Sequence, residues 1–290
     1  MKPPDFAYHA PHTLAETLHL LATLDNARLL AGGQSLMPML AMRFAFPDHV
    51  IDLNCVDGLA GIAQQGETLV IGAMTRQRDL LDHPTVQRRM PLLAEALALV
   101  GHRQTRNRGT IGGSLCHLDP AAELVAVMTA LDATVEIAGP TGRRTLKMAE
   151  FPLGYMTPAL EPYEILTAIR VPLPPPHHGA CFLEFSRRHG DFAIVSAGAM
   201  LTLSGTGTGT IATASIVLGG VGAVPVRLTA AETRLTGQRP DETLFAHAAD
   251  TAGSIDAMED ALIPAWYRAR LAVTLTRRAL ISAHRRLGTP

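Results

Sequence analysis

Two stretches in which paired glycines follow a short apolar run constrain this chain more than any other feature. The first is AGGQS at residues 31–35, and the second is TIGGS at residues 110–114. Glycine has no Cβ atom, so the backbone can approach a bulky ligand closely, and successive free N–H groups in a turn form a concave anion site. We therefore expect two turns that together hold the two phosphates of one pyrophosphate, with the hydroxyls of Ser35, Thr110 and Ser114 adding hydrogen bonds.

Paired glycines are also common in ordinary loops, so either stretch alone is a weak signal. The longer strings AGGQSLMPML, residues 31–40, and RNRGTIGGSLCHLDPAAE, residues 106–123, are far more specific. Together they closely resemble the FAD-binding medium subunit of the molybdenum hydroxylases, a family that includes carbon monoxide dehydrogenase and xanthine dehydrogenase. The resemblance covers essentially the whole chain, from Phe6 to the last predicted helix.

This resemblance implies an α+β protein that binds one FAD non-covalently. It implies an FAD-binding fold of the PCMH/vanillyl-alcohol-oxidase-like type in two α/β subdomains, at residues 1–54 and 55–175, and a C-terminal α+β domain with an antiparallel sheet and helices at residues 176–290. The residues expected to contact the cofactor are Leu30, Ala31, Gly32, Gly33, Gln34, Ser35, Leu36, Gly109, Thr110, Ile111, Gly112, Gly113, Ser114, Asp119, Leu166 and Phe192.

Three of these residues also have a plain structural interpretation. Asp119 suits an N-cap, with Pro120 at the first position of a helix that runs to about Asp132; by resemblance it lies beside the flavin, and both roles are compatible. Leu166 lies on a predicted strand and would otherwise be a core residue. Phe192 lies between two predicted strands, where the carbon monoxide dehydrogenase type places an aromatic residue against the flavin ring; the alternative is core packing.

The remaining chain shows ordinary signals of secondary structure. Thr13 to Glu16 has the spacing of a capping box before an amphipathic helix. The segment from Gly101 to Gly109, which carries Arg103, Arg106 and Arg108, is interpreted as a polar loop, and its arginines as a solvated face or a subunit contact rather than as site residues. GTGTG at residues 205–209 is interpreted as a hairpin turn.

Composition excludes several function classes. The chain has 290 residues, 47% of them hydrophobic and 18% charged, with a formal net charge of −1, so it has no basic field for nucleic acid or an anionic membrane. No signal-peptide pattern and no apolar run of about 18 residues is present, which makes the cytoplasm the expected location. The three cysteines lie far apart without cluster or zinc spacing, so no metal site is predicted. No catalytic side chain is predicted either.

The resemblance implies an electron relay. Electrons leave a substrate at a molybdopterin centre in a large partner subunit, pass through [2Fe–2S] clusters in a small subunit, reach FAD here and leave to an external acceptor. A dimer of heterotrimers is expected, and the substrate would be set by the large subunit. Two alternatives stay open: a self-sufficient FAD-dependent oxidase or dehydrogenase, and a non-redox scaffold subunit that has lost FAD.

Overall fold

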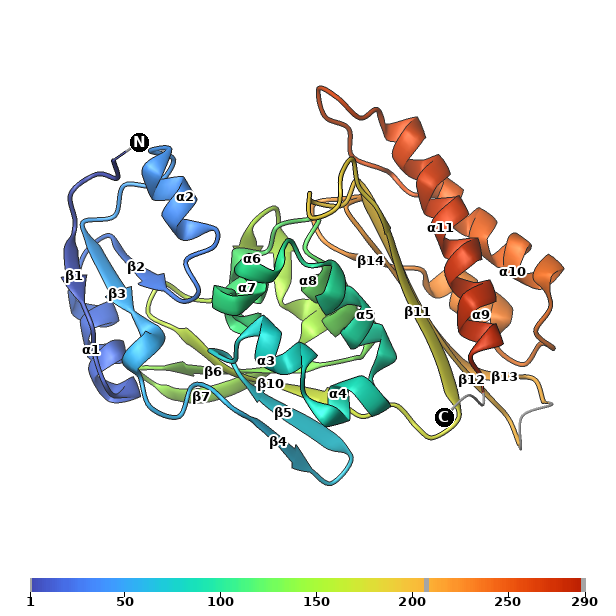
Figure 1. The fold of residues 1–290 in the computed structure, drawn as a ribbon, viewed down its shortest axis with the longest axis horizontal. Helices are drawn as coiled ribbons and strands as arrows, with labels where there is room; N and C mark the ends of the chain where they lie inside the picture. The colour runs from blue at the N-terminus through green and yellow to red at the C-terminus, as the bar shows by residue number, and fades with distance from the viewer. Residues whose placement is uncertain (1, 206–208, 288–290) are drawn as a thin grey trace.

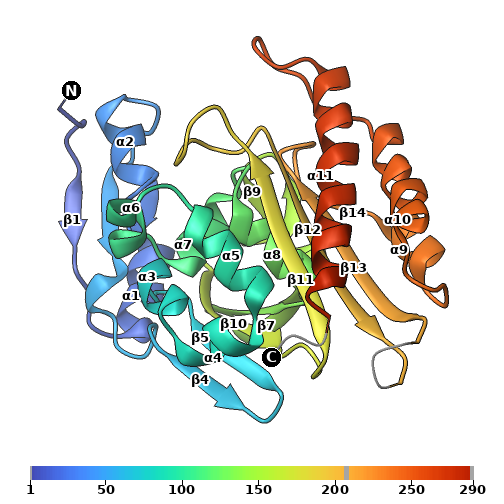
Figure 2. The ribbon, with the colours of Figure 1, turned by 45° about the vertical axis from the view of Figure 1, so that its right-hand side comes forward.

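Three main β-sheets follow one another along the long axis of the molecule (Figure 1). The computed structural model describes residues 2–205 and 209–287. Each sheet is built from one continuous part of the chain, and helices fill the spaces between and beside the sheets (Figures 1 and 2). The α+β class predicted from the sequence is confirmed.

The N-terminal unit is a small parallel sheet with two helices. Its strands pair in the order β1-β3-β2. Its elements are β1 (Ala7–His9), α1 (Leu14–Thr23), β2 (Ala27–Leu30), α2 (Leu36–Ala41), β3 (His49–Asp52) and the 3-10 turn η1 (Leu53–Cys55). Thr13 caps α1, because its side chain accepts a hydrogen bond from the Glu16 N–H, so the predicted capped helix is confirmed. Leu21 of α1 packs against Ile51 of β3 in the core of this unit.

The middle unit is a five-stranded antiparallel sheet covered by short helices. The strand order is β4-β5-β10-β6-β7. The strands are β4 (Ile62–Gln65), β5 (Thr68–Gly72), β6 (Thr134–Gly139), β7 (Gly142–Lys147), β10 (Ile165–Pro172) and the separate pair β8 (Pro152–Gly154) and β9 (Thr157–Pro158). The helices are α3 (Gln77–Leu81), α4 (Pro84–Arg89), α5 (Pro91–Leu99), α6 (Arg103–Arg108), α7 (Ile111–His117), α8 (Glu123–Ala130) and the 3-10 turn η2 (Met148–Glu150).

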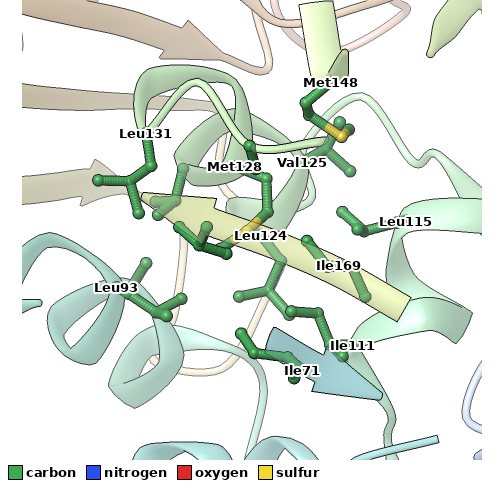
Figure 3. Close-up of a cluster of buried hydrophobic side chains, with 14 of the residues drawn as sticks. Ile71, Leu93, Ile111, Leu115, Leu124, Val125, Met128, Leu131, Met148 and Ile169 are labelled. Carbon is green, nitrogen blue, oxygen red and sulfur yellow. The ribbon is translucent and has the colours of Figure 1, made fainter. Parts of the chain in front are cut away.

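The largest core lies between this sheet and its helices. Figure 3 shows Ile111 of α7 and Leu124 of α8 converging on Ile71 of β5 and Ile169 of β10. Every residue of α8 is buried, because the helix lies between the middle sheet and the third sheet. This central position explains why its sequence is apolar almost all round.

The C-terminal unit is an antiparallel sheet in the order β11-β12-β13-β14, backed by a long helix. Its elements are β11 (His178–Phe185), β12 (Val195–Leu203), β13 (Ile211–Gly219), β14 (Val226–Arg227), α9 (Thr229–Leu235), α10 (Glu242–Ala249), the 3-10 turn η3 (Asp250–Ser254) and α11 (Ala265–Arg285). Ala180 and Phe182 of β11 face the core of the middle unit, whereas Cys181 faces α11. The sheet is therefore buried on both sides, as the layers in Figure 2 show.

Two sequence predictions about local structure are wrong. The polar segment before Gly109 is a helix, α6, and the Arg106 guanidinium satisfies the carbonyls of Val100 and Gly101 just before it. Asp119 is not a helix N-cap: α8 begins only at Glu123, with Ala122 as its N-cap. Asp119 instead closes a separate turn, in which its Oδ1 accepts from the Ala121 N–H and its carbonyl from the Ala122 N–H.

The predicted hairpin turn at residues 205–209 lies partly outside the described residues, since residues 206–208 are not among them.

Candidate flavin site

The first Gly-Gly segment forms a turn whose backbone N–H groups are free. It follows β2 and leads into α2, and Gly33 has a φ of +73°, a conformation that favours glycine. Within residues 2–205 and 209–287, the N–H groups of Gly33, Gln34, Ser35 and Leu36 have no hydrogen-bond partner. Ser35 is the N-cap of α2, but its side chain caps nothing. Four consecutive donors with a free hydroxyl beside them form the kind of concave anion site predicted from the sequence.

The second Gly-Gly segment is not a turn, which corrects the sequence prediction. Gly112 and Gly113 lie in the first turn of α7, and Thr110 is the N-cap, whose Oγ1 accepts from the Gly113 N–H at 3.1 Å. The Ile111 N–H donates to the Thr75 carbonyl, and the Gly112 N–H donates to the Ala73 carbonyl. The donors at the start of α7 are therefore already used inside the chain.

The glycines of the second segment serve close packing. A Cβ atom at Gly112 would lie 2.6 Å from the Ala73 Cβ and 2.7 Å from the Ala73 carbonyl oxygen. A Cβ at the buried Gly109 would lie 2.5 Å from Gln77 Oε1. These contacts hold α7 against the end of β5, so that Ile111 enters the core of the middle unit.

The two segments lie directly against each other. A Cβ atom at Gly32 would lie 2.3 Å from the Arg108 carbonyl oxygen and 2.8 Å from the Gly109 Cα. A Cβ at Gly113 would lie 3.4 Å from the Ala31 Cβ. The prediction that these distant parts of the chain meet at one place is therefore confirmed by the contacts between them.

Two residues that the sequence analysis missed join the segments. Asn54 donates from Nδ2 to the Ala31 carbonyl at 3.0 Å. The Arg76 guanidinium donates to Asn54 Oδ1 and to the Arg108 carbonyl. Burial, followed by the nearby charge of Arg108, lowers the pKa of Arg76. Neither residue lies in a recognisable motif, because the contacts link three separate parts of the chain.

The segment between β11 and β12 brings the C-terminal unit against His102, just before α6. A Cβ at Gly190, whose φ is +85°, would lie 2.3 Å from His102 Cε1. The rings of His102 and His189 are 5.9 Å apart and meet edge to face. Phe192, in the same segment, is 64% exposed, so the core-packing alternative for this residue is wrong. An exposed aromatic ring on this segment is available to a flat apolar ligand.

Arg268 of α11, another residue missed by the sequence analysis, fixes this segment. Its Nη1 donates to the Ile194 carbonyl at 2.6 Å and to the Gly220 carbonyl at 2.7 Å. The Gly220 N–H in turn donates to the Pro120 carbonyl, next to Asp119. Asp260 also pairs with Arg268. One buried cation therefore links the Phe192 segment and the Asp119 turn.

The other residues that the sequence predicted to contact the cofactor differ in burial and in hydrogen bonding. Leu30 ends β2, and Gln34 is exposed and donates from Nε2 to the Gly32 carbonyl at 3.2 Å. The Ser114 hydroxyl has no partner within the described chain. Asp119 is half-buried, whereas Leu166 is only 4% exposed and belongs to the core cluster. Contact between Leu166 and a flavin remains a prediction.

The donor set fits a phosphate-bearing cofactor rather than a metal. Free N–H groups attract anions and repel cations. No group of three or more His, Cys, Asp or Glu side chains among residues 2–205 and 209–287 is arranged to hold a metal ion. No helix in the part of the chain described by the structure is long and apolar enough to cross a membrane.

Comparison with known proteins gives the class of this fold and site. Residues 4–174 match the FAD binding domain in molybdopterin dehydrogenase. Residues 180–283 match the CO dehydrogenase flavoprotein C-terminal domain. These two matches define a flavoprotein with an FAD-binding domain followed by a C-terminal domain.

Similarity to individual proteins extends over the full length. The chain is 40% identical to the carbon monoxide dehydrogenase medium chain of Hydrogenophaga pseudoflava, over 98% of each chain. It is also 40% identical to the 6-hydroxypseudooxynicotine dehydrogenase complex subunit alpha of Paenarthrobacter nicotinovorans, over 98% of this chain and 96% of that one. A solved structure of the Hydrogenophaga pseudoflava carbon monoxide dehydrogenase superposes with a TM-score of 0.95, covering 99% of this chain and all of that one. The chain belongs to the family of FAD-binding medium subunits of the molybdenum hydroxylases, as its sequence motifs indicated.

Proposed function

We propose that this chain holds one FAD non-covalently and passes electrons from the [2Fe–2S] clusters of a small partner subunit to an external acceptor. A large partner subunit would carry the molybdopterin centre and oxidise the substrate. We further propose a dimer of heterotrimers in the cytoplasm. The observation that carries the proposal is the set of free N–H groups at residues 33–36, held against the second Gly-Gly segment.

Geometry supports the proposed phosphate-binding role of the first segment, and the family resemblance supports the proposed contacts with the flavin ring. The free N–H groups and the Ser35 hydroxyl can bind phosphate oxygens, because charge-assisted hydrogen bonds are the strong ones. The second segment, from Gly109 to Ser114, forms the opposite wall, with the Ser114 hydroxyl available as a donor. Asp119 and Phe192 would lie at the flavin ring and Leu166 behind it. The cofactor supplies the redox chemistry, and the protein supplies binding and orientation.

The substrate stays open. The two relatives of equal identity have names that refer to carbon monoxide and to 6-hydroxypseudooxynicotine, which are chemically unlike. This chain therefore does not determine which molecule the complex oxidises.

The first test is the chain purified alone. We expect a yellow protein that releases FAD on acid denaturation, contains no iron, is reduced by dithionite and oxidises no aldehyde, N-heterocycle or carbon monoxide. Release of FMN, or colour that stays with the precipitated protein, would contradict the cofactor assignment. A colourless protein that binds no added FAD would favour the scaffold alternative, and sustained turnover by the chain alone would favour the self-sufficient flavoenzyme.

The second test is co-expression with the two partner subunits. The complex should be brown from its iron–sulfur clusters, and substrate should bleach the flavin absorbance within it. If substrate reduces the clusters but never the flavin, the relay direction proposed here is wrong.

A further inference from the structure

A cluster of polar side chains lies where the start of α8 meets the C-terminal sheet. Glu184 of β11, Ser196 of β12 and Gly219 of β13 are direct cross-strand neighbours in one row. They lie on the face that looks toward the middle unit, as Phe182 does. A Cβ at Gly219 would lie 2.5 Å from Ser196 Oγ and 3.5 Å from the Ala126 Cβ of α8.

Glu123 lies on the face of α8 that packs against this row of strand residues. It precedes Ala126 by three residues, so both lie on the same face of α8. The Pro120 carbonyl, just before α8, accepts from the Gly220 N–H, next to Gly219. Glu184 is also among the groups whose charge acts on Glu123. The start of α8 and this row of strand residues therefore lie on the two sides of the contact between the FAD-binding domain and the C-terminal domain.

Most of this cluster is buried, and two of its polar atoms lack partners. Glu123 is 5% exposed and Ser196 is fully buried. Within residues 2–205 and 209–287, Ser196 Oγ and the buried Glu184 Oε2 have no hydrogen-bond partner. Burying a carboxylate without a compensating bond is costly, so an ionised pair at this place would be strongly unfavourable.

No cation among the described residues pairs with either carboxyl group. The titratable groups on the elements packed against α8 are Glu95 of α5, Cys116 and His117 of α7, Arg227 of β14 and Glu150 of η2. Glu95 is bound to Arg286 and to the Phe182 N–H. Arg227 binds Glu232 and Asp132 at the far end of α8. The remaining charged neighbour, Asp119, is acidic and acts in the same direction as Glu184.

A buried carboxyl group and a half-buried one that have no cation beside them favour the protonated form, because burial and nearby like charge both disfavour ionisation. Burial raises the pKa of Glu123 to about 8, with smaller contributions from the charges of Glu184 and Asp119. Burial likewise raises the pKa of Glu184 to about 7. A hydrogen bond from the Glu123 backbone N–H lowers the pKa of Glu123 but does not offset burial, whereas the raised pKa of Glu184 agrees with its unpartnered Oε2.

We propose that Glu123 and Glu184 share one proton at neutral pH and form a proton store at the contact between the FAD-binding domain and the C-terminal domain. Glu123 follows Asp119 by four residues, and Glu184 lies near the end of β11, just before the segment that carries Phe192. Its connection with the flavin rests on the function proposed above. Electrons that arrive from the partner clusters make the cofactor more negative, and this favours protonation of the pair. The step itself is a proton transfer only: one O–H bond of a water molecule breaks, an O–H bond forms on the carboxylate oxygen, and the hydroxide is neutralised by the buffer.

Infrared spectroscopy of the isolated chain tests the shared proton without any flavin. A C=O stretch of a protonated carboxyl group should be present at pH 6 and disappear with a midpoint between about 7 and 8. Glu123→Gln and Glu184→Gln should each move this midpoint to lower pH, because the remaining group loses a negatively charged neighbour, and the double variant should lack the band. Glu95→Gln is the matched control at the same interface, and it should retain the band and its midpoint.

Three results would overturn the proposal: no titrating carboxyl band in the wild-type chain, a band that survives in the double variant, or single variants whose midpoint equals that of the wild type. The first two exclude a protonated pair, and the third shows two independent groups.

Stability against pH gives a second readout. A carboxyl group whose pKa is higher in the folded state than in the unfolded state costs stability as pH rises. For Glu123 this loss should accumulate between the ordinary value of 4.5 and about 8. Glu123→Gln should therefore flatten the decline in the free energy of unfolding over this window, while Glu95→Gln should not. A decline of unchanged slope in Glu123→Gln would contradict the buried acid.

The coupling to the flavin is tested in the FAD-loaded chain. Reduction by dithionite at pH 8 should increase the carboxyl band in the wild type and leave the double variant unchanged. If the wild-type band does not respond although FAD is bound, the coupling is wrong. If the chain binds no FAD while the apo band titrates as expected, the proposed function fails and the shared proton stands.

Discussion

The two Gly-Gly segments are similar in sequence but differ in backbone conformation and hydrogen bonding. In the first, Gly33 adopts a positive φ, and the N–H groups at residues 33–36 have no hydrogen-bond partner within the described residues. In the second, Gly112 and Gly113 are helical, and the N–H groups at the start of α7 are bonded to Thr75, Ala73 and Thr110. The first segment leaves backbone donors free, whereas the second uses its donors and its glycines for packing within the chain.

This difference shows why a glycine pair is an ambiguous signal. Glycine permits a left-handed turn, and it equally permits two backbones to touch. At Gly112 the reason is contact with Ala73, whereas at Gly33 it is backbone conformation. The two uses predict different consequences of substitution, and the variants below separate them.

Gly112→Val should have the largest effect, and it should act on the fold. The new side chain would lie within 2.7 Å of a backbone carbonyl that cannot move away freely. Overpacking of this kind typically costs about 1–3 kcal/mol, and occasionally more, so we expect a loss of about 3 kcal/mol in the free energy of unfolding. Denaturant unfolding measures it. Ser114→Ala, two residues along the same helix, is the control and should cost far less. A folded, fully stable Gly112→Val protein would contradict the packing role.

Gly33→Ala should have the next largest effect, and it should act on binding. The positive φ costs about 1 kcal/mol for alanine. Displacing the free N–H groups would weaken charge-assisted hydrogen bonds worth roughly 1.5–3 kcal/mol each, so FAD affinity should fall at least tenfold. Gly58→Ala is the matched control, because Gly58 has a φ of +75° and open space around it. Both variants should lose similar stability, but only Gly33→Ala should lose flavin. Equal flavin occupancy in the two proteins would remove the first segment from the site.

The sequence predicted most of the fold because its signals are local. The capping box at Thr13 needs only neighbouring residues, and α1 begins where the pattern indicates. Helix α6 was missed because its residues are polar all round and show no apolar periodicity. Its start is fixed instead by Arg106, which donates to the Val100 and Gly101 carbonyls that precede the helix.

The site was only partly predictable, because several of its contacts join residues that are far apart in the sequence. The motif strings indicated which segments meet, but Asn54, Arg76 and Arg268 act through contacts with backbone carbonyls far away in sequence. Such a contact depends on the assembled fold, and no spacing rule encodes it. Glu123 appeared in the sequence only as the end of a motif string, and its burial against Glu184 required the third sheet to be in place.

Gly113→Ala tests the place where the two segments meet. Gly113 is helical, so alanine improves helix propensity by about 1 kcal/mol, but its Cβ would lie 2.8 Å from Thr110 Oγ1 and 3.4 Å from the Ala31 Cβ. We expect a nearly unchanged free energy of unfolding and a several-fold loss of FAD affinity, measured by flavin fluorescence titration. A stabilised variant with full FAD affinity would show that this contact does not shape the site.

Thr110→Val should have the smallest effect, and it separates capping from binding. Thr110 and Thr13 both cap a helix through a side-chain hydroxyl that accepts an N–H at 3.1 Å. Removing such a cap costs about 1 kcal/mol, so Thr110→Val and Thr13→Val should lower the free energy of unfolding similarly. Only Thr110→Val should also weaken FAD binding, because it releases the Gly113 N–H at the contact with Ala31. Thr110→Ser should restore both properties, since it keeps the hydroxyl. Equal FAD affinity in the two valine variants would reduce Thr110 to a helix cap and leave cofactor binding to the first segment.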